Sequence, residues 1–90
     1  MTMRMSDMGL AQNGYKRVAC FKVFQKETTG WLVWTYTCWK KSDTECIVRV
    51  TNNHRFNWLH IFNSRDDANR YIKMKLAEAQ SSGNNWKREF

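Results

Sequence analysis

Few side chains in this chain of 90 residues have types and spacing suited to metal binding or catalysis. Cys38, Cys46 and His60 are the best zinc candidates, because a hairpin between the two cysteines would bring their thiols together. Their spacing matches no known zinc motif, and free cysteines are commonly buried, so we predict no metal ion and no cofactor. Asp66 and Asp67 are adjacent, and a place in the first turn of a helix explains both carboxylates without an active site.

The sequence also lacks the common catalytic motifs. It contains no G-x-S-x-G, no P-loop and no H-E-x-x-H. We therefore predict a non-enzymatic protein without catalytic residues. A small basic nuclease with His54 or His60 as its general base is kept as an alternative, although nothing positions a second acid–base group.

The chain is strongly basic, with 15 Lys and Arg against eight Asp and Glu and a net charge of +7. Residues 15–63 contain eight of the bases and only three of the acids. Such a charge attracts nucleic acid, acidic proteins or nucleoprotein complexes. We expect no membrane partner, because no run of about 18 apolar residues occurs. Three cysteines, an odd number, indicate a reducing cytoplasm, or the host cytoplasm if the chain is phage-encoded.

The elements that position these residues follow from local periodicity. Four segments rich in β-branched and aromatic residues are joined by connections too short for parallel crossovers, which predicts antiparallel hairpins. Ser64 followed by Asp67 resembles a helix N-cap, and apolar residues then recur every three or four positions through residue 80. The predicted fold is α+β, a four-stranded antiparallel β-meander with one C-terminal α-helix packed on one sheet face. The predicted strands are 17–25, 31–40, 45–51 and 55–63.

The remainder of the chain is divided by composition. Residues 1–14 show neither helical nor strand periodicity and are predicted to be a flexible N-terminal arm. Residues 15–81 form the single predicted domain, and residues 82–90 form a C-terminal tail. The single helix can cover only one face of the sheet, so we expect the other face to carry the function.

Strand alternation predicts which residues that second face presents. On the second strand, Trp34 and Tyr36 point toward the helix, and Trp31 and Trp39 point away from it. Aromatic and basic groups then interleave, as nucleic-acid surfaces and protein hot spots both require. The arm, the tail or a dimer mate could instead cover this face for stability. The predicted binding residues are Lys22, Trp31, Trp39, Lys40, Lys41, Arg49 and Arg55.

The segment W-L-H-I-F-N-S-R-D-D-A-N-R-Y-I, residues 58–72, resembles the last strand and helix of AP2-like DNA-binding domains. That family includes the arm-binding domains of phage-type integrases. The resemblance implies a sheet placed in the DNA major groove and a helix that braces its back. The small size, the odd cysteine number and the lack of enzyme motifs also resemble small phage-encoded inhibitors, anti-CRISPR proteins among them.

The leading prediction is a non-enzymatic binding protein that presents a basic, aromatic sheet face to nucleic acid or to a nucleoprotein complex. One alternative is a phage-type inhibitor that binds an acidic host protein and blocks it sterically. The small basic nuclease is the second alternative. The sequence leaves open whether the chain forms a homodimer.

Overall fold

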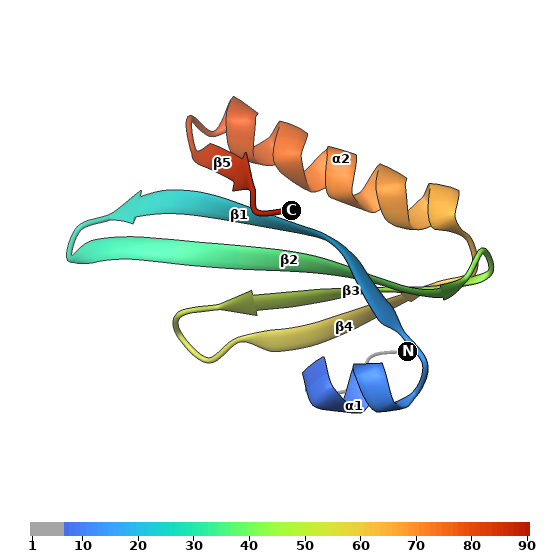
Figure 1. The fold of residues 1–90 in the computed structure, drawn as a ribbon. Helices are drawn as coiled ribbons and strands as arrows, with labels where there is room; N and C mark the ends of the chain where they lie inside the picture. Colours follow the sequence, from blue (N-terminus) through green and yellow to red (C-terminus); the bar gives the residue numbers. More distant parts are fainter. Residues whose placement is uncertain (1–6) are drawn as a thin grey trace.

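The computed structural model, which describes residues 7–90, contains one antiparallel sheet with a helix on each face (Figure 1). The strand order is β4-β3-β2-β1-β5, so β4 and β5 are the two edges of an open sheet. The α+β class, the antiparallel sheet and the C-terminal helix are confirmed, but the prediction of four strands is wrong because the tail adds a fifth. The elements are α1 (Asp7–Gln12), β1 (Lys16–Glu27), β2 (Gly30–Ser42), β3 (Glu45–Asn52), β4 (Asn57–Phe62), α2 (Arg65–Ser81) and β5 (Asn85–Arg88).

Helix α2 begins where the N-cap pattern places it. The Ser64 hydroxyl accepts a hydrogen bond from the backbone N–H of Asp67 at 3.1 Å, which satisfies one of the free donors of the first turn. Ile72 is buried against the sheet, and Tyr71 and Leu76 pack beside it as partly buried residues. The apolar stripe read from the sequence therefore faces the strands.

The main core lies between α2 and the sheet. Strand alternation is confirmed, because Tyr36, Val48 and Val50 all point toward the helix from neighbouring strands. The fourth strand, whose orientation the sequence left open, places His60 toward α2 and Leu59 toward the opposite face. The buried residues of this core are Val23, Tyr36, Cys46, Val48, Val50, Ala68, Ile72 and Ala79.

The opposite face carries a second, smaller core beneath α1. Leu10 of α1 is fully buried and packs with Trp39, Ile47 and Leu59. The prediction of a flexible N-terminal arm over residues 1–14 is therefore wrong for residues 7–12, which form α1, while residues 1–6 lie outside the described residues. A six-residue helix is too short to be stable alone, so its stability comes from docking rather than from a repeating pattern. Gly14 has a φ of 87°, which lets the chain turn from α1 into β1.

The tail is part of the same domain. Its residues Asn85–Arg88 pair antiparallel with β1, with Trp86 opposite Val23 and Arg88 opposite Phe21. The Trp86 and Phe21 rings meet edge to face with centroids 6.2 Å apart. β5 has four residues and no apolar alternation, so its partner far away in the sequence specifies it.

Candidate binding surface

The structure separates the seven predicted binding residues into different parts of the molecule. Lys22 and Trp31 stay on the sheet face opposite α2, on the part that α1 leaves open. Trp39 and Arg49 lie on the same face but at α1. Lys40 and Lys41 lie near the β2–β3 turn, and Arg55 lies in the β3–β4 turn with a positive φ of 69°.

Trp39 and Arg49 are not available as a binding platform, which corrects the prediction. Trp39 is only 5% exposed because Leu10 packs against it. The Arg49 guanidinium donates hydrogen bonds to Asp7 of α1 and to Asn57 of β4. Strand alternation placed both side chains on the correct face, but α1 covers that half of the sheet. Cover by the N-terminal segment, one of the alternatives, therefore holds for this half.

The lysines of the β2–β3 turn have local carboxylate partners. The Lys40 ammonium lies 2.8 Å from Asp43, and the Lys41 ammonium lies 4.0 Å from Glu45. The Lys40 ammonium also holds the pKa of the Asp43 carboxyl below its ordinary value. Because each ammonium already has a carboxylate partner, these lysines attract an external anion less strongly than unpaired lysines would.

The uncovered part of this face, which we call the open half-face, is formed by β5, β1 and the first half of β2. Its residues stand in register across the strands. Lys22 lies between Thr35 and Lys87, and Lys26 lies opposite Trp31. The open half-face consists of Lys22, Phe24, Lys26, Trp31, Val33, Thr35 and Lys87.

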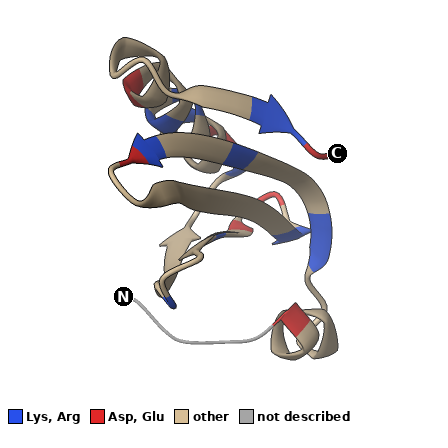
Figure 2. Cartoon of the chain, turned by 90° about the vertical axis from the view of Figure 1, so that its left-hand side faces the viewer, with Lys and Arg blue, Asp and Glu red and all other residues tan. Residues whose placement is uncertain are grey.

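Cations and aromatic rings are interleaved on the open half-face. The Lys26 ammonium lies 4.8 Å from the centre of the Trp31 ring, and the Lys87 ammonium lies 5.9 Å from the centre of the Phe24 ring. Lys22 and Lys26 have no carboxylate partner within the described residues, whereas Lys87 lies 3.5 Å from Glu89. Figure 2 shows Lys and Arg positions spaced along β1 and at the end of β5.

Five of the seven residues of this surface are absent from the predicted site: Phe24, Lys26, Val33, Thr35 and Lys87. Phe24 has the same alternation as Lys22, so strand parity could have found it. Lys26 lies one residue beyond the predicted strand 17–25, so alternation along that strand did not include it. Lys87 had no signal in the sequence, because its position depends on the pairing of β5 with β1.

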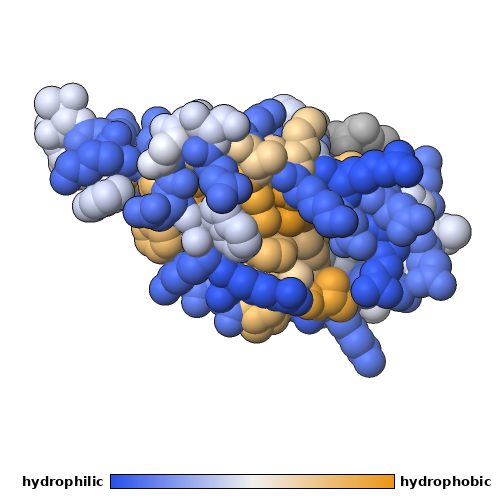
Figure 3. Space-filling model, turned by 90° about the horizontal axis from the view of Figure 1, so that it is seen from above, coloured by the Kyte–Doolittle hydropathy of each residue, from blue (hydrophilic) through white to orange (hydrophobic). Residues whose placement is uncertain are grey.

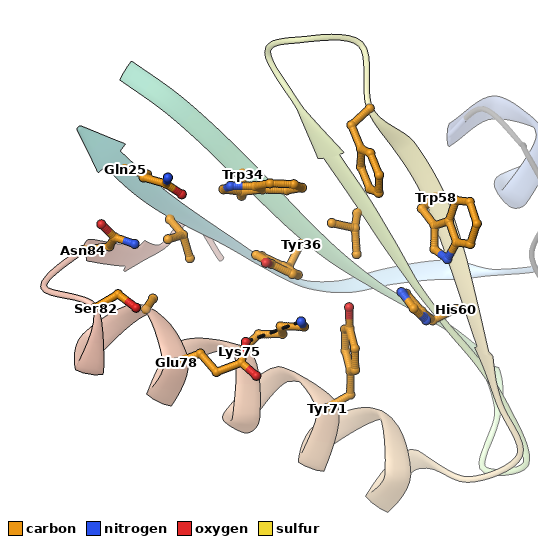
Figure 4. Close-up of a pocket in the computed structure, with 14 residues that line it drawn as sticks. Gln25, Trp34, Tyr36, Trp58, His60, Tyr71, Lys75, Glu78, Ser82 and Asn84 are labelled. Atoms are coloured by element: carbon orange, nitrogen blue, oxygen red, sulfur yellow. Dashed lines mark hydrogen bonds and ion pairs between the residues drawn. The ribbon is translucent and has the colours of Figure 1, made fainter. Parts of the chain in front are cut away.

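The α2 side of the sheet contains a groove of about 450 Å³ that aromatic side chains line (Figure 4). The rings of Trp34 and Phe56 meet edge to face with centroids 5.3 Å apart, and Phe56 stacks with Trp58 at 6.2 Å. Lys75 and Glu78 of α2 form an ion pair of 3.4 Å on the helix side of the groove. The charges in the groove therefore balance, unlike those of the open half-face.

The titratable rings of the groove are neutral at pH 7. Burial, with smaller contributions from Tyr36 and Glu78, raises the pKa of Tyr71 to about 12. Burial also lowers the pKa of His60, with a smaller contribution from the Lys75 ammonium. The His60 and Tyr71 rings pack with centroids 4.7 Å apart. These rings therefore form a packed aromatic wall of the groove.

A second hollow, of about 510 Å³, lies between α2 and β1. Phe21, Cys38 and Leu76 form part of its apolar floor, and Arg65 and Lys73 are among its cationic residues. Figure 3 shows apolar surface gathered at the centre of the side that carries α2 and β5, with hydrophilic side chains around it.

The described part of the chain contains no group of three His, Cys, Asp or Glu side chains that could hold a metal ion. The three cysteines are free thiols. His54 lies 3.8 Å from Glu27 on an exposed turn, and His60 packs against Tyr71 in the groove, so the two imidazoles belong to different surfaces. No helix within residues 7–90 has the length and apolar character needed to cross a membrane.

Comparison with known proteins identified no relative of this chain. No family model matches the chain, and neither a curated protein nor a solved structure is significantly similar to it. The chain is thus defined by its own geometry, as a small α+β protein with an exposed surface of lysines and aromatic rings.

Proposed function

We propose that the protein binds single-stranded nucleic acid on the open half-face. The observation that carries this proposal is the cross-strand pair of Lys22 and Lys87, which stand directly opposite each other on one sheet face. Like charges in this position destabilise a sheet. Glu89, 3.5 Å from the Lys87 ammonium, offsets part of that cost, and a phosphate bound at Lys22 would offset the rest.

The order of groups along β1 fits a nucleic-acid strand. Lys22 and Lys26 are four residues apart on one face, which separates their Cα atoms by about 13 Å. Phe24 lies between them, and Trp31 on β2 is its diagonal neighbour at about 7 Å. Cations therefore flank the Phe24 ring, and one of them lies beside the Trp31 ring, so one strand can place phosphates on the lysines and bases on the rings.

Exposure and shape favour a single strand over a duplex. Trp31 is 50% exposed near the end of the β1–β2 hairpin, where an unpaired base can reach its ring. Paired bases in a duplex are stacked on each other and cannot stack on a side chain without unpairing. Helix α1 also packs on this face, which leaves the strip formed by β5, β1 and the start of β2 accessible among the described residues (Figure 1).

Fluorescence anisotropy with labelled oligothymidine, oligouridine and a DNA duplex tests the proposal. The logarithm of the association constant for single strands is expected to fall linearly with the logarithm of salt concentration, with a slope of about −0.7 per phosphate contacted. The double variant Lys22→Ala/Lys26→Ala should bind more weakly and lose about 1.4 from the magnitude of that slope. Trp31→Ala should weaken binding by about 10- to 100-fold through lost stacking.

Two controls separate site from net charge. Arg70→Ala/Lys73→Ala removes the same charge from exposed positions on α2 and should change binding much less. Met74→Ala truncates an exposed apolar side chain on α2 and should leave affinity unchanged. Preference for the duplex would contradict single-strand binding. Capture of an acidic host protein from nuclease-treated lysate, without affinity for any oligonucleotide, would instead favour the steric inhibitor.

A further inference from the structure

The two edges of the sheet differ in how well they are protected against pairing with another strand. Edge strands in natural proteins carry charges, bulges or prolines that prevent such pairing. β5 is four residues long and contains Lys87 and Arg88. β4 has the sequence N-W-L-H-I-F, with no Asp, Glu, Lys, Arg or Pro, and it pairs with β3 without a register shift.

Both faces of β4 expose large apolar side chains. Trp58 is 43% exposed on the α2 side, and Ile61 is 41% exposed on the α1 side. A strand that ends a sheet in water normally presents polar residues on at least one face. Apolar side chains on both faces, beside a backbone edge that pairs with no strand in residues 7–90, are typical of a strand inside a larger sheet.

We propose that β4 pairs antiparallel with β4 of a second copy of the chain, centred on His60, to form a continuous ten-stranded sheet. In this register His60 faces its own equivalent, Trp58 faces Phe62 of the second copy, and Leu59 faces Ile61 of the second copy. Each opposed pair is apolar or aromatic, so the edge is complementary to itself, as a two-fold symmetric interface requires. A strand from an unrelated protein could form the same backbone hydrogen bonds, but its side chains would not be matched to those of β4 in this way.

Electrostatics permits the pairing of two basic chains. Burial lowers the pKa of His60, so the two imidazoles at the centre do not form a like-charge pair at neutral pH. The strand order places β1 three strands inward from β4, so the two copies of β1 lie about 34 Å apart across the joined sheet. That separation exceeds the Debye length of about 8 Å at physiological salt, and screening therefore weakens repulsion between the two open half-faces.

The assembly also has a consequence for shape. Antiparallel pairing of identical edges places the two-fold axis perpendicular to the sheet, so the equivalent faces of both copies lie on the same side. Both copies of α2 would flank a shared strip of Trp58, His60 and Phe62. Both open half-faces would lie on the other side, at opposite ends.

Sedimentation equilibrium of the full chain tests the assembly. The wild type should be a dimer, and Ile61→Lys should be a monomer, because it places a like-charge barrier on the edge. Met74→Lys is the matched control: it adds the same charge at a similarly exposed position, 49% exposed on α2, and should remain a dimer. Circular dichroism checks that both variants fold. A wild type that stays monomeric at about 100 μM, a dimeric Ile61→Lys, or a monomeric Met74→Lys would overturn the proposal.

Cysteine cross-linking tests the register itself. The symmetric position 60 places two Cα atoms about 4.5–5.5 Å apart, within the span of a disulfide. His60→Cys should therefore form a covalent dimer under mild oxidation, and wild type, with only its three native thiols, should not. Trp86→Cys on the β5 edge is the control and should stay uncross-linked. Failure of position 60 to cross-link in a dimeric sample, or cross-linking at position 86 instead, would refute pairing through β4.

Discussion

Truncation of Leu10 to alanine tests whether α1 is a docked part of the fold. The side chain is fully buried among Trp39, Ile47 and Leu59. The change removes about three methylene-sized groups at about 0.8 kcal/mol each, so the lost transfer free energy is about 2.4 kcal/mol. A rigid cavity would raise the cost toward about 5 kcal/mol, but a six-residue surface helix can shift to fill the space. We therefore expect the free energy of unfolding to fall by about 2–3 kcal/mol.

Urea denaturation followed by far-UV circular dichroism measures this loss. Gln12→Ala, an exposed substitution on the same helix, is the control and should change the free energy of unfolding by less than about 0.5 kcal/mol. Hydrogen exchange should show lower protection in α1 of the Leu10 variant, while α2 keeps its protection. Equal effects of the two substitutions would show that Leu10 does not anchor α1 and would contradict a second core beneath this helix.

Three further predictions concern α2, His60 and the thiols. Ser64→Ala should cost about 1 kcal/mol in chemical denaturation, because it removes the cap on the Asp67 N–H; no loss would show that the cap is unimportant. Because the fold lowers the pKa of His60 below 6.5, the neutral imidazole is the form that folding favours. The free energy of unfolding should therefore be fully retained above about pH 6.5 and decline as the pH falls through the folded pKa, and His60→Gln should make this decline smaller; an identical pH profile would contradict the burial of His60. Burial raises the pKa of Cys38 to about 11, so its reaction with a disulfide reagent at pH 8 should be far slower in the folded protein than after denaturation; equal rates would contradict its burial.

Local signals in the sequence were enough to predict the central part of the fold. Ser64 and the apolar stripe that follows it located α2 to within a residue at its end, because capping and periodicity are short-range properties. Alternation along β2 also assigned Trp34 and Tyr36 to the α2 side, since side chains on a strand point to opposite faces in turn.

Elements specified by distant contacts could not be predicted in the same way. Leu10 is a single apolar anchor in α1, and its partners on β2, β3 and β4 are known only from the folded arrangement. Trp39 was predicted as a binding residue because strand alternation identifies the sheet face on which a side chain lies. It does not show what covers that face. Lys87 likewise entered the candidate site only through the pairing of β5 with β1.

Because β5 is the last strand in the chain and pairs with β1, the sheet can be completed only after residues 85–88 have been synthesised. During translation, the residues of β1 to β4 and α2 are synthesised before residues 85–88. Until β5 pairs with β1, the outer edge of β1 has no partner strand. An unpaired edge on a nascent chain can join the edge of a neighbouring chain and start aggregation. Lys22 and Lys26 stand on that edge strand, and their charges repel a second copy until β5 closes it. The lysines of the proposed phosphate-binding surface therefore also place charge on the strand whose outer edge is open whenever β5 is not paired with it.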